Sequence, residues 1–199
     1  MLDGVFVNAY LPPSFDEKEI LRYAGSKEAD EGVEVLLNEC LKECENAFSY
    51  RVCYRIFEKE AFLESFGGGS KALQKNLDGS AYAVAFAATV GLPIDRLIAK
   101  YASVRTAKSL LFQAIGTERS EALCDLFCED IKVRAGAKGY FSRPRFSPGY
   151  GDFPLQVQTA LLQALDASRK IGLSLTESLL MTPTKSVTAV VGLSPQSAK

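Results

Sequence analysis

The segment RPRFSPGYGDFPLQVQ, residues 143–158, contains the side chains best suited to hold a small ligand. Arg145 carries a planar, permanently charged guanidinium that can grip a carboxylate with two parallel hydrogen bonds. Tyr150 adds a ring and a hydroxyl, Gly149 permits close approach of another group, and Asp152 is expected to cap the helix that follows. The pattern indicates either a stiff ligand-binding loop or an ordinary surface turn with an exposed arginine.

The sequence contains no histidine. This absence removes the commonest general base, a frequent metal ligand and the partner of the usual serine and cysteine nucleophiles. Any chemistry performed by these residues must therefore proceed without routine proton transfer by an imidazole.

Four of the five cysteines form two pairs at helical spacing, Cys40 with Cys44 and Cys124 with Cys128. The odd number and the spacing argue against a disulfide framework and favour reduced thiols on helix faces. Four thiolates could bind zinc if the two helices met, although the spacing lacks the CxxC element of common zinc sites. Burial in the core is the favoured interpretation, because free cysteine behaves as a small apolar residue.

The glycine-rich stretch FGGGSKALQKN, residues 66–76, is superficially similar to a phosphate-binding loop. It lacks the glycine, lysine and hydroxyl order of that motif, and no strong strand leads into it. We interpret it as a flexible connection in which Ser70 caps a short helix.

Charge and hydropathy exclude several classes of partner. The 23 basic and 24 acidic residues nearly cancel, so no overall field favours nucleic acid or an anionic membrane. The N-terminus lacks the basic region of a signal peptide, and no stretch approaches the roughly 18 apolar residues of a membrane span. We expect a cytoplasmic protein that binds neither nucleic acid nor membrane and recognises its partners locally.

The hydrophobic pattern predicts an irregular alternation of helices and strands within one domain of 199 residues. Predicted helices cover residues 16–24, 28–48, 103–134 and 153–171, and predicted strands cover 50–57, 81–89, 173–181 and 186–192. This order favours an α+β fold with a mixed or antiparallel central sheet flanked by helices.

Several finer expectations follow from the same pattern. Strand 50–57 alternates in polarity and should have one face in solvent, whereas strand 81–89 is small and apolar throughout and should be covered on both faces. Gly116 is expected to bend or break the long helix. Residues 193–199 are expected to form a frayed tail.

The spacing of Arg145, Gly149 and Tyr150 within RFSPGY, followed by a helix and then IGLSLTESLLMTPTKSVTAVVG (171–192), resembles the activation domain of cobalamin-dependent methionine synthases. Two further stretches, AATVGLPIDRLIAKY and AIGTERSEALCD, are similar to other parts of that domain. The resemblance runs from about residue 70 to 192 and is strongest after Arg145. Residues 1–65 match only in their helix and strand pattern.

The resemblance implies a C-shaped α+β domain that binds S-adenosylmethionine and presents its methyl group to the cobalt of an oxidised cobalamin enzyme. It also implies an electron supplied by a flavodoxin-like donor, with the cobalamin held by the partner rather than by this chain. Because the methyl donor leaves as a neutral thioether, no general acid is required, which agrees with a sequence that has no histidine.

The resemblance also assigns candidate binding residues. Arg145 matches the arginine that grips the ligand carboxylate, and Gly149 with Tyr150 match the end of the loop motif. Ser147 would offer backbone groups to the adenine or ribose. Glu121 matches an acidic residue near the sulfonium, although a solvated helix carboxylate is the alternative.

Three differences from the family pattern fall within the matched region. The acidic and histidine-bearing run after the tyrosine is GDFPLQVQ here, an aromatic late in the last strand is Val191, and an acidic residue before the loop is missing in AKGYFS. These differences concern ligand affinity and contact with cobalamin.

The resulting hypothesis is a free-standing, S-adenosylmethionine-binding protein that reactivates, in trans, a methionine synthase lacking its own activation domain. Two alternatives remain open: a non-catalytic module that senses S-adenosylmethionine or docks, and a reactivator of another corrinoid methyltransferase.

Overall fold

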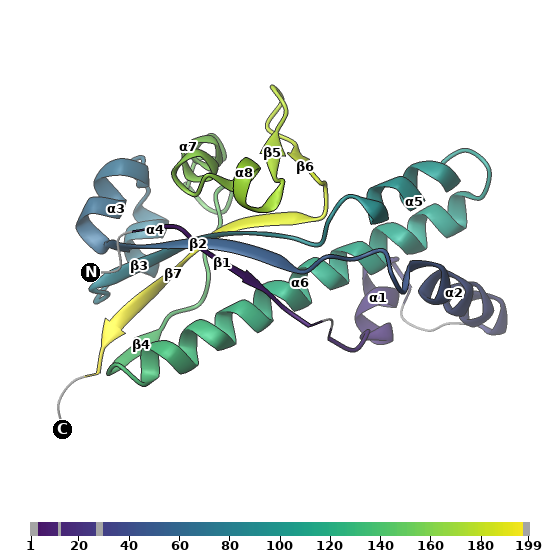
Figure 1. The fold of residues 1–199 in the computed structure, drawn as a ribbon, viewed down its shortest axis with the longest axis horizontal. Helices are drawn as coiled ribbons and strands as arrows, with labels where there is room; N and C mark the ends of the chain where they lie inside the picture. Colours follow the sequence, from purple (N-terminus) through teal and green to yellow (C-terminus); the bar gives the residue numbers. More distant parts are fainter. Residues whose placement is uncertain (1–3, 12, 27–29, 197–199) are drawn as a thin grey trace.

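The main architectural element is one five-stranded antiparallel sheet with strand order β1-β2-β3-β7-β4. A computed structural model describes residues 4–11, 13–26 and 30–196. The strands of this sheet are β1 (Phe6–Ala9), β2 (Arg51–Glu58), β3 (Tyr82–Thr89), β7 (Ser186–Pro195) and β4 (Tyr140–Ser142). The sheet is curled and strongly twisted (Figure 1). The predicted α+β class, with a flanked central sheet, is confirmed, and every pairing in the described sheet is antiparallel.

Helices cover both faces of the sheet (Figure 1). The described residues form eight helices: α1 (Glu17–Tyr23), α2 (Glu31–Cys44), α3 (Lys59–Phe66), α4 (Lys71–Asn76), α5 (Pro93–Tyr101), α6 (Thr106–Gly136), α7 (Val157–Ala164) and α8 (Ala167–Ile171). The long α6 packs on one face through the largest core cluster, and α3, α4, α7 and α8 pack on the other. None of the helices in the described part of the chain has the length and apolar character needed to cross a bilayer.

The two central strands are covered on both faces. Every residue of β3 from Ala83 to Thr89 is buried, as its small apolar sequence predicts. The prediction that one face of β2 meets solvent is wrong, because Cys53 is fully buried against α8. The sequence of β2 alternates in polarity, but the helix that covers its second face comes from a distant part of the chain.

Gly116 does not break the long helix, contrary to expectation: α6 is continuous from Thr106 to Gly136. A Cβ at Gly116 would lie 2.9 Å from Cγ of Lys185 and 3.2 Å from Cγ1 of Ile94. Glycine at this position therefore serves the close approach of the segment that leads into β7.

The predicted helix 153–171 is two helices, α7 and α8, separated at Asp166 in the left-handed region at φ 49°. The break lets Leu165 and Ala167, both fully buried, pack into the same cluster against the sheet. The predicted strand 173–181 is likewise wrong. The range contains the two-residue strand β5 (Ser174–Leu175) and the first residue of β6 (Met181–Thr182). These two strands pair in a hairpin separate from the main sheet.

Other boundaries also differ from the predictions. The helix expected at 28–48 is described from Glu31 to Cys44, and positions 28 and 29 lie outside the described residues. Strand β7 continues to Pro195 and pairs there with β4, so 193–195 are not a tail, whereas 197–199 lie outside the described residues. Strands β1 and β4 and helix α3 were not predicted.

Two local predictions are confirmed. The Ser70 hydroxyl accepts a hydrogen bond from the Leu73 amide at 3.0 Å and caps α4. Cys40, Cys44 and Cys124 are fully buried in the core cluster. Burial raises the pKa of the Cys44 thiol to about 12, as expected for a packing residue rather than a reactive thiolate.

A fully buried arginine ties the N-terminal segment to α6. Arg119 forms an ion pair with Glu118, and its guanidinium donates to the backbone oxygens of Pro13 at 2.6 Å and Ser14 at 2.7 Å. It also lies over the Phe15 ring, 4.3 Å from the centroid. These contacts hold the middle of α6 in register with the segment that leads into α1.

Replacing Arg119 by alanine should lower the free energy of unfolding by about 3 to 5 kcal/mol, because it leaves the buried Glu118 carboxylate without its partner. Chemical denaturation measures this change. Arg22→Ala is the matched control, because its ion pair with Glu19 is exposed, and it should have a much smaller effect. Equal losses in the two variants would contradict the assignment.

Candidate functional site

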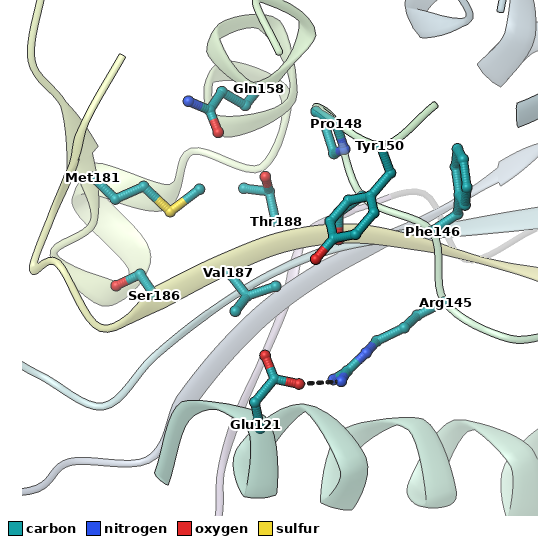
Figure 2. A pocket seen from close by; sticks show the side chains of 11 residues that line it. Glu121, Arg145, Phe146, Pro148, Tyr150, Gln158, Met181, Ser186, Val187 and Thr188 are labelled. Carbon is teal, nitrogen blue, oxygen red and sulfur yellow. Dashed lines mark hydrogen bonds and ion pairs between the residues drawn. The ribbon is translucent and has the colours of Figure 1, made fainter. Parts of the chain in front are cut away.

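A pocket of about 390 Å³ lies beside the outer edge of β7. Strand β7 crosses its middle, with α6 below and α7 above in the close view (Figure 2). The residues that line it are Glu121, Arg145, Phe146, Ser147, Pro148, Tyr150, Gln158, Met181, Ser186, Val187 and Thr188. The pocket therefore draws on the loop 143–156, on both helices and on the start of β7.

The loop is held against β7 by backbone hydrogen bonds. The Arg143 amide donates to the Gly192 oxygen at 2.8 Å, and Phe146 and Val190 exchange two hydrogen bonds of 2.9 Å each. The Phe146 ring stacks on Phe153, with centroids 6.1 Å apart. Arg145 lies between the two attachment points, so its backbone is fixed on both sides.

The Arg145 guanidinium is only partly satisfied. Its Nη2 forms an ion pair with Glu121 of α6, whereas its Nη1 is buried and has no hydrogen-bond partner among the described residues. Nη1 forms a longer ion pair with the exposed Asp125 carboxylate, at 3.5 Å. A buried donor without a partner is costly, so this nitrogen is ready to bind an anionic group that enters the pocket.

The structure brings four of the five candidate residues together. Arg145, Ser147, Tyr150 and Glu121 all line the pocket, and the ring of Tyr150 is 67% exposed at its mouth. Gly149 does not line it. That glycine has φ 91°, and its amide donates to the Phe153 oxygen at 2.8 Å, so its conformation serves the turn after Ser147.

The prediction that Asp152 caps the helix that follows it is wrong. Asp152 instead caps the N-terminus of α4. Its carboxylate accepts hydrogen bonds from the amides of Lys71 at 2.9 Å and Ala72 at 3.0 Å, and from the Ser70 hydroxyl. The Ser70 hydroxyl and then these amides lower the pKa of the Asp152 carboxyl. The loop is thus attached to residues 80 to 82 positions earlier in the chain, a pairing that sequence spacing cannot reveal.

Sequence reasoning missed several pocket residues. Gln158 and Thr188 are 4% and 3% exposed although both are polar. Met181, at the end of the β5–β6 hairpin, also contributes to the wall. The sequence held one indication of these residues: each is a polar side chain at an inward position, Gln158 on α7 and Thr188 on β7. Buried polar side chains are unusual unless they have a hydrogen-bond partner.

A second groove of about 630 Å³, between α6 and the segment that contains α1, shares Glu121 with the pocket. Its carboxylate residues are Asp16, Glu19, Glu118, Glu121, Asp125 and Glu129. Most of them form ion pairs, but the six carboxylates outnumber the four cations that pair with them, Arg22, Arg119, Lys132 and Arg145. The excess leaves a negative potential beside the pocket. The site can therefore bind a carboxylate at Arg145 while favouring a ligand of net positive charge.

Comparison with known proteins gives one family match, to the model described as "Vitamin B12 dependent methionine synthase, activation domain", over residues 72–199. The chain belongs to this family. The structure is also similar to the crystal structure of the MetH reactivation domain bound to AdoHcy, with a TM-score of 0.66 and 19% sequence identity. That similarity covers 98% of this chain and 80% of the other, and it concerns the fold. No curated protein sequence matches the chain.

Family membership fits the position of the loop motif. The matched region contains all five candidate residues, and the fold similarity extends over the N-terminal part that the sequence motifs do not cover. Figure 2 shows the ion pair between Arg145 of the loop and Glu121 of α6. These two residues are 24 positions apart in sequence.

The Asp152 anchor should make stability depend on pH. Its pKa is lowered on folding, so its contribution is present above the unfolded value of about 4 and is lost as pH falls through the lower folded value. The difference in unfolding free energy between wild type and Asp152→Asn should be largest near neutral pH and should shrink below about pH 4. A pH-independent difference would contradict this assignment.

Proposed function

We propose that the pocket binds S-adenosylmethionine and that this chain supports reductive methylation of a cobalamin held by methionine synthase modules outside these 199 residues. One observation carries the proposal: the buried Nη1 of Arg145 has no hydrogen-bond partner and belongs to a loop within the family match. A carboxylate such as that of the methionine portion supplies the missing acceptor.

The charges around the pocket support this ligand. S-adenosylmethionine carries a carboxylate, an ammonium and a sulfonium, and so has a net positive charge. Glu121 stays paired with Arg145 through one oxygen and has a second oxygen available for a cationic group. Together with the neighbouring acidic groove, this arrangement favours the cationic donor over its neutral demethylated product.

The other pocket residues would orient the donor rather than react. The methyl donor reacts as a sulfonium and leaves as a neutral thioether, so the protein has no proton to supply. Ser147 offers backbone groups and its hydroxyl within the pocket, and Tyr150 places an exposed ring at the mouth. A site without histidine is sufficient for binding and orientation of this kind.

The cobalamin would be held by the partner. These residues contain no histidine that could ligate its cobalt from below. Tyr150, which lines the pocket and is 67% exposed, offers an aromatic surface for a large cofactor presented by another module. A flavodoxin-like protein is the proposed electron donor.

Arg145→Ala should weaken S-adenosylmethionine binding by about 2 to 4 kcal/mol, roughly 30- to 900-fold in Kd, because the ligand carboxylate loses its charged partner. Calorimetric titration measures this change. Fold stability should change little, because Glu121 is 39% exposed and can be hydrated once its partner is removed.

The matched control for this titration is Arg96→Ala, which removes an exposed arginine on α5, outside the residues that line the pocket. It should bind as wild type does. Absence of saturable binding to the wild-type protein would refute the proposed ligand.

Reactivation in trans is a separate test. The wild-type protein, added with S-adenosylmethionine and a reductant to an oxidised methionine synthase that lacks its activation domain, should restore turnover, and Arg145→Ala should not. Ligand binding without restored turnover would favour a sensing or docking module. Restoration only of a different corrinoid methyltransferase would favour the other alternative.

A further inference from the structure

Gln158 is a nearly buried residue of the pocket wall. Its side chain is uncharged, so the charges of the ligand do not explain its presence there. It lies in the first turn of α7, is 4% exposed, and donates from Nε2 to the backbone oxygen of Leu179 at 2.8 Å. This bond fixes the orientation of the carboxamide, with the donor toward the β5–β6 hairpin and the acceptor Oε1 turned away from it. Figure 2 shows the nitrogen on the hairpin side and the oxygen directed toward Thr188.

The turn that receives this hydrogen bond has a defined but costly conformation. The Thr176 amide donates to the Leu180 oxygen at 2.9 Å, and the Leu180 amide donates to Oγ1 of Thr176 at 3.1 Å. Leu179 has φ 63°, in the left-handed region, which is disfavoured for a residue with a Cβ. Such a conformation persists when tertiary contacts hold it.

The hairpin itself has few means of holding its shape. It is a two-stranded sheet that does not pair with the main sheet, and isolated hairpins of this size are marginal in water. Its base is anchored by Leu173, Leu175 and Met181, which pack into the cluster under α8. Its tip projects away from the molecule, and Leu180 there is 65% exposed (Figure 1).

We infer that Gln158 is a positioning residue of the site: its carboxamide holds the β5–β6 hairpin, and with it Met181, where the hairpin closes the wall of the pocket across from Arg145. Met181 and Arg145 lie on opposite sides of the pocket in Figure 2. The inference deepens the proposed function and rests on it for the identity of the ligand, S-adenosylmethionine.

The variant Gln158→Glu tests the inference, because it keeps the size of the side chain and its pocket-facing acceptor and, when ionised, replaces the donor by a negatively charged oxygen. The added charge would attract a cationic ligand, so it cannot by itself explain weaker binding. At pH 7.5 the ionised carboxylate faces the Leu179 oxygen, and the Kd for S-adenosylmethionine should rise about tenfold relative to wild type. As pH falls, the new carboxyl becomes protonated and can donate again, so the ratio of the two Kd values should return toward one. A residue that merely fills space would not give this recovery.

Gln163→Glu is the matched control, with the same chemical change on the same helix at an exposed position, and it should bind within about twofold of wild type at each pH. A readout without ligand is amide hydrogen exchange at Thr176 and Leu180. Exchange there should be about tenfold faster in Gln158→Glu at pH 7.5 and unchanged in Gln163→Glu.

The two readouts separate failure of this inference from failure of the proposed function. Unchanged exchange in Gln158→Glu would overturn the inference whether or not the ligand binds. Faster exchange with unchanged affinity, or an affinity loss that low pH does not reverse, would also overturn it. Wild-type protein that shows no binding, together with faster exchange in the variant, would refute the proposed ligand and still support the role of Gln158 in holding the hairpin.

Discussion

The open outer edge of β7 is the constraint on which the site depends. Along its other edge β7 pairs with β3 over Ser186 to Leu193, but its outer edge is paired only from Val190 onward, first by Phe146 and then by β4. The loop leaves the sheet at Phe146, and Pro148 has no amide to donate to a continued ladder. The first residues of β7 therefore face the pocket instead of a neighbouring strand.

This open edge gives the charged residues their geometry. Because the loop is fixed to β7 on both sides of Arg145, the guanidinium reaches across the sheet edge to α6 and meets Glu121. The ion pair restrains one nitrogen, whereas the other is buried without a hydrogen-bond partner and has only the longer ion pair with Asp125. A side chain held in this way has already lost much of its rotamer freedom. Binding of a carboxylate therefore costs less side-chain entropy than it would at a mobile arginine.

Local patterns predicted the local features of the site, and long-range packing decided the rest. The stiff loop with Arg145 and Tyr150 was visible in the sequence, as was the apolar strand β3, because proline, glycine and hydrophobic periodicity act over a few residues. The attachment of Asp152 to α4 and the cover over Cys53 were not visible, since both partners lie far away in sequence. The periodicity places Gln158 on the same helix face as Leu161 and Leu162, but it could not reveal that the carboxamide binds the Leu179 oxygen.

The distribution of charge over the pocket constrains how a ligand can lie in it. Glu121 and Arg145 are on the α6 side of β7, whereas Gln158, Met181 and Thr188 are uncharged and lie toward α7 and the hairpin (Figure 2). For the proposed ligand, this distribution favours an orientation across the sheet edge, with the amino-acid end at the guanidinium. The uncharged adenosyl portion would then meet the wall that Gln158 is proposed to position, and no formal charge would have to be buried against Met181.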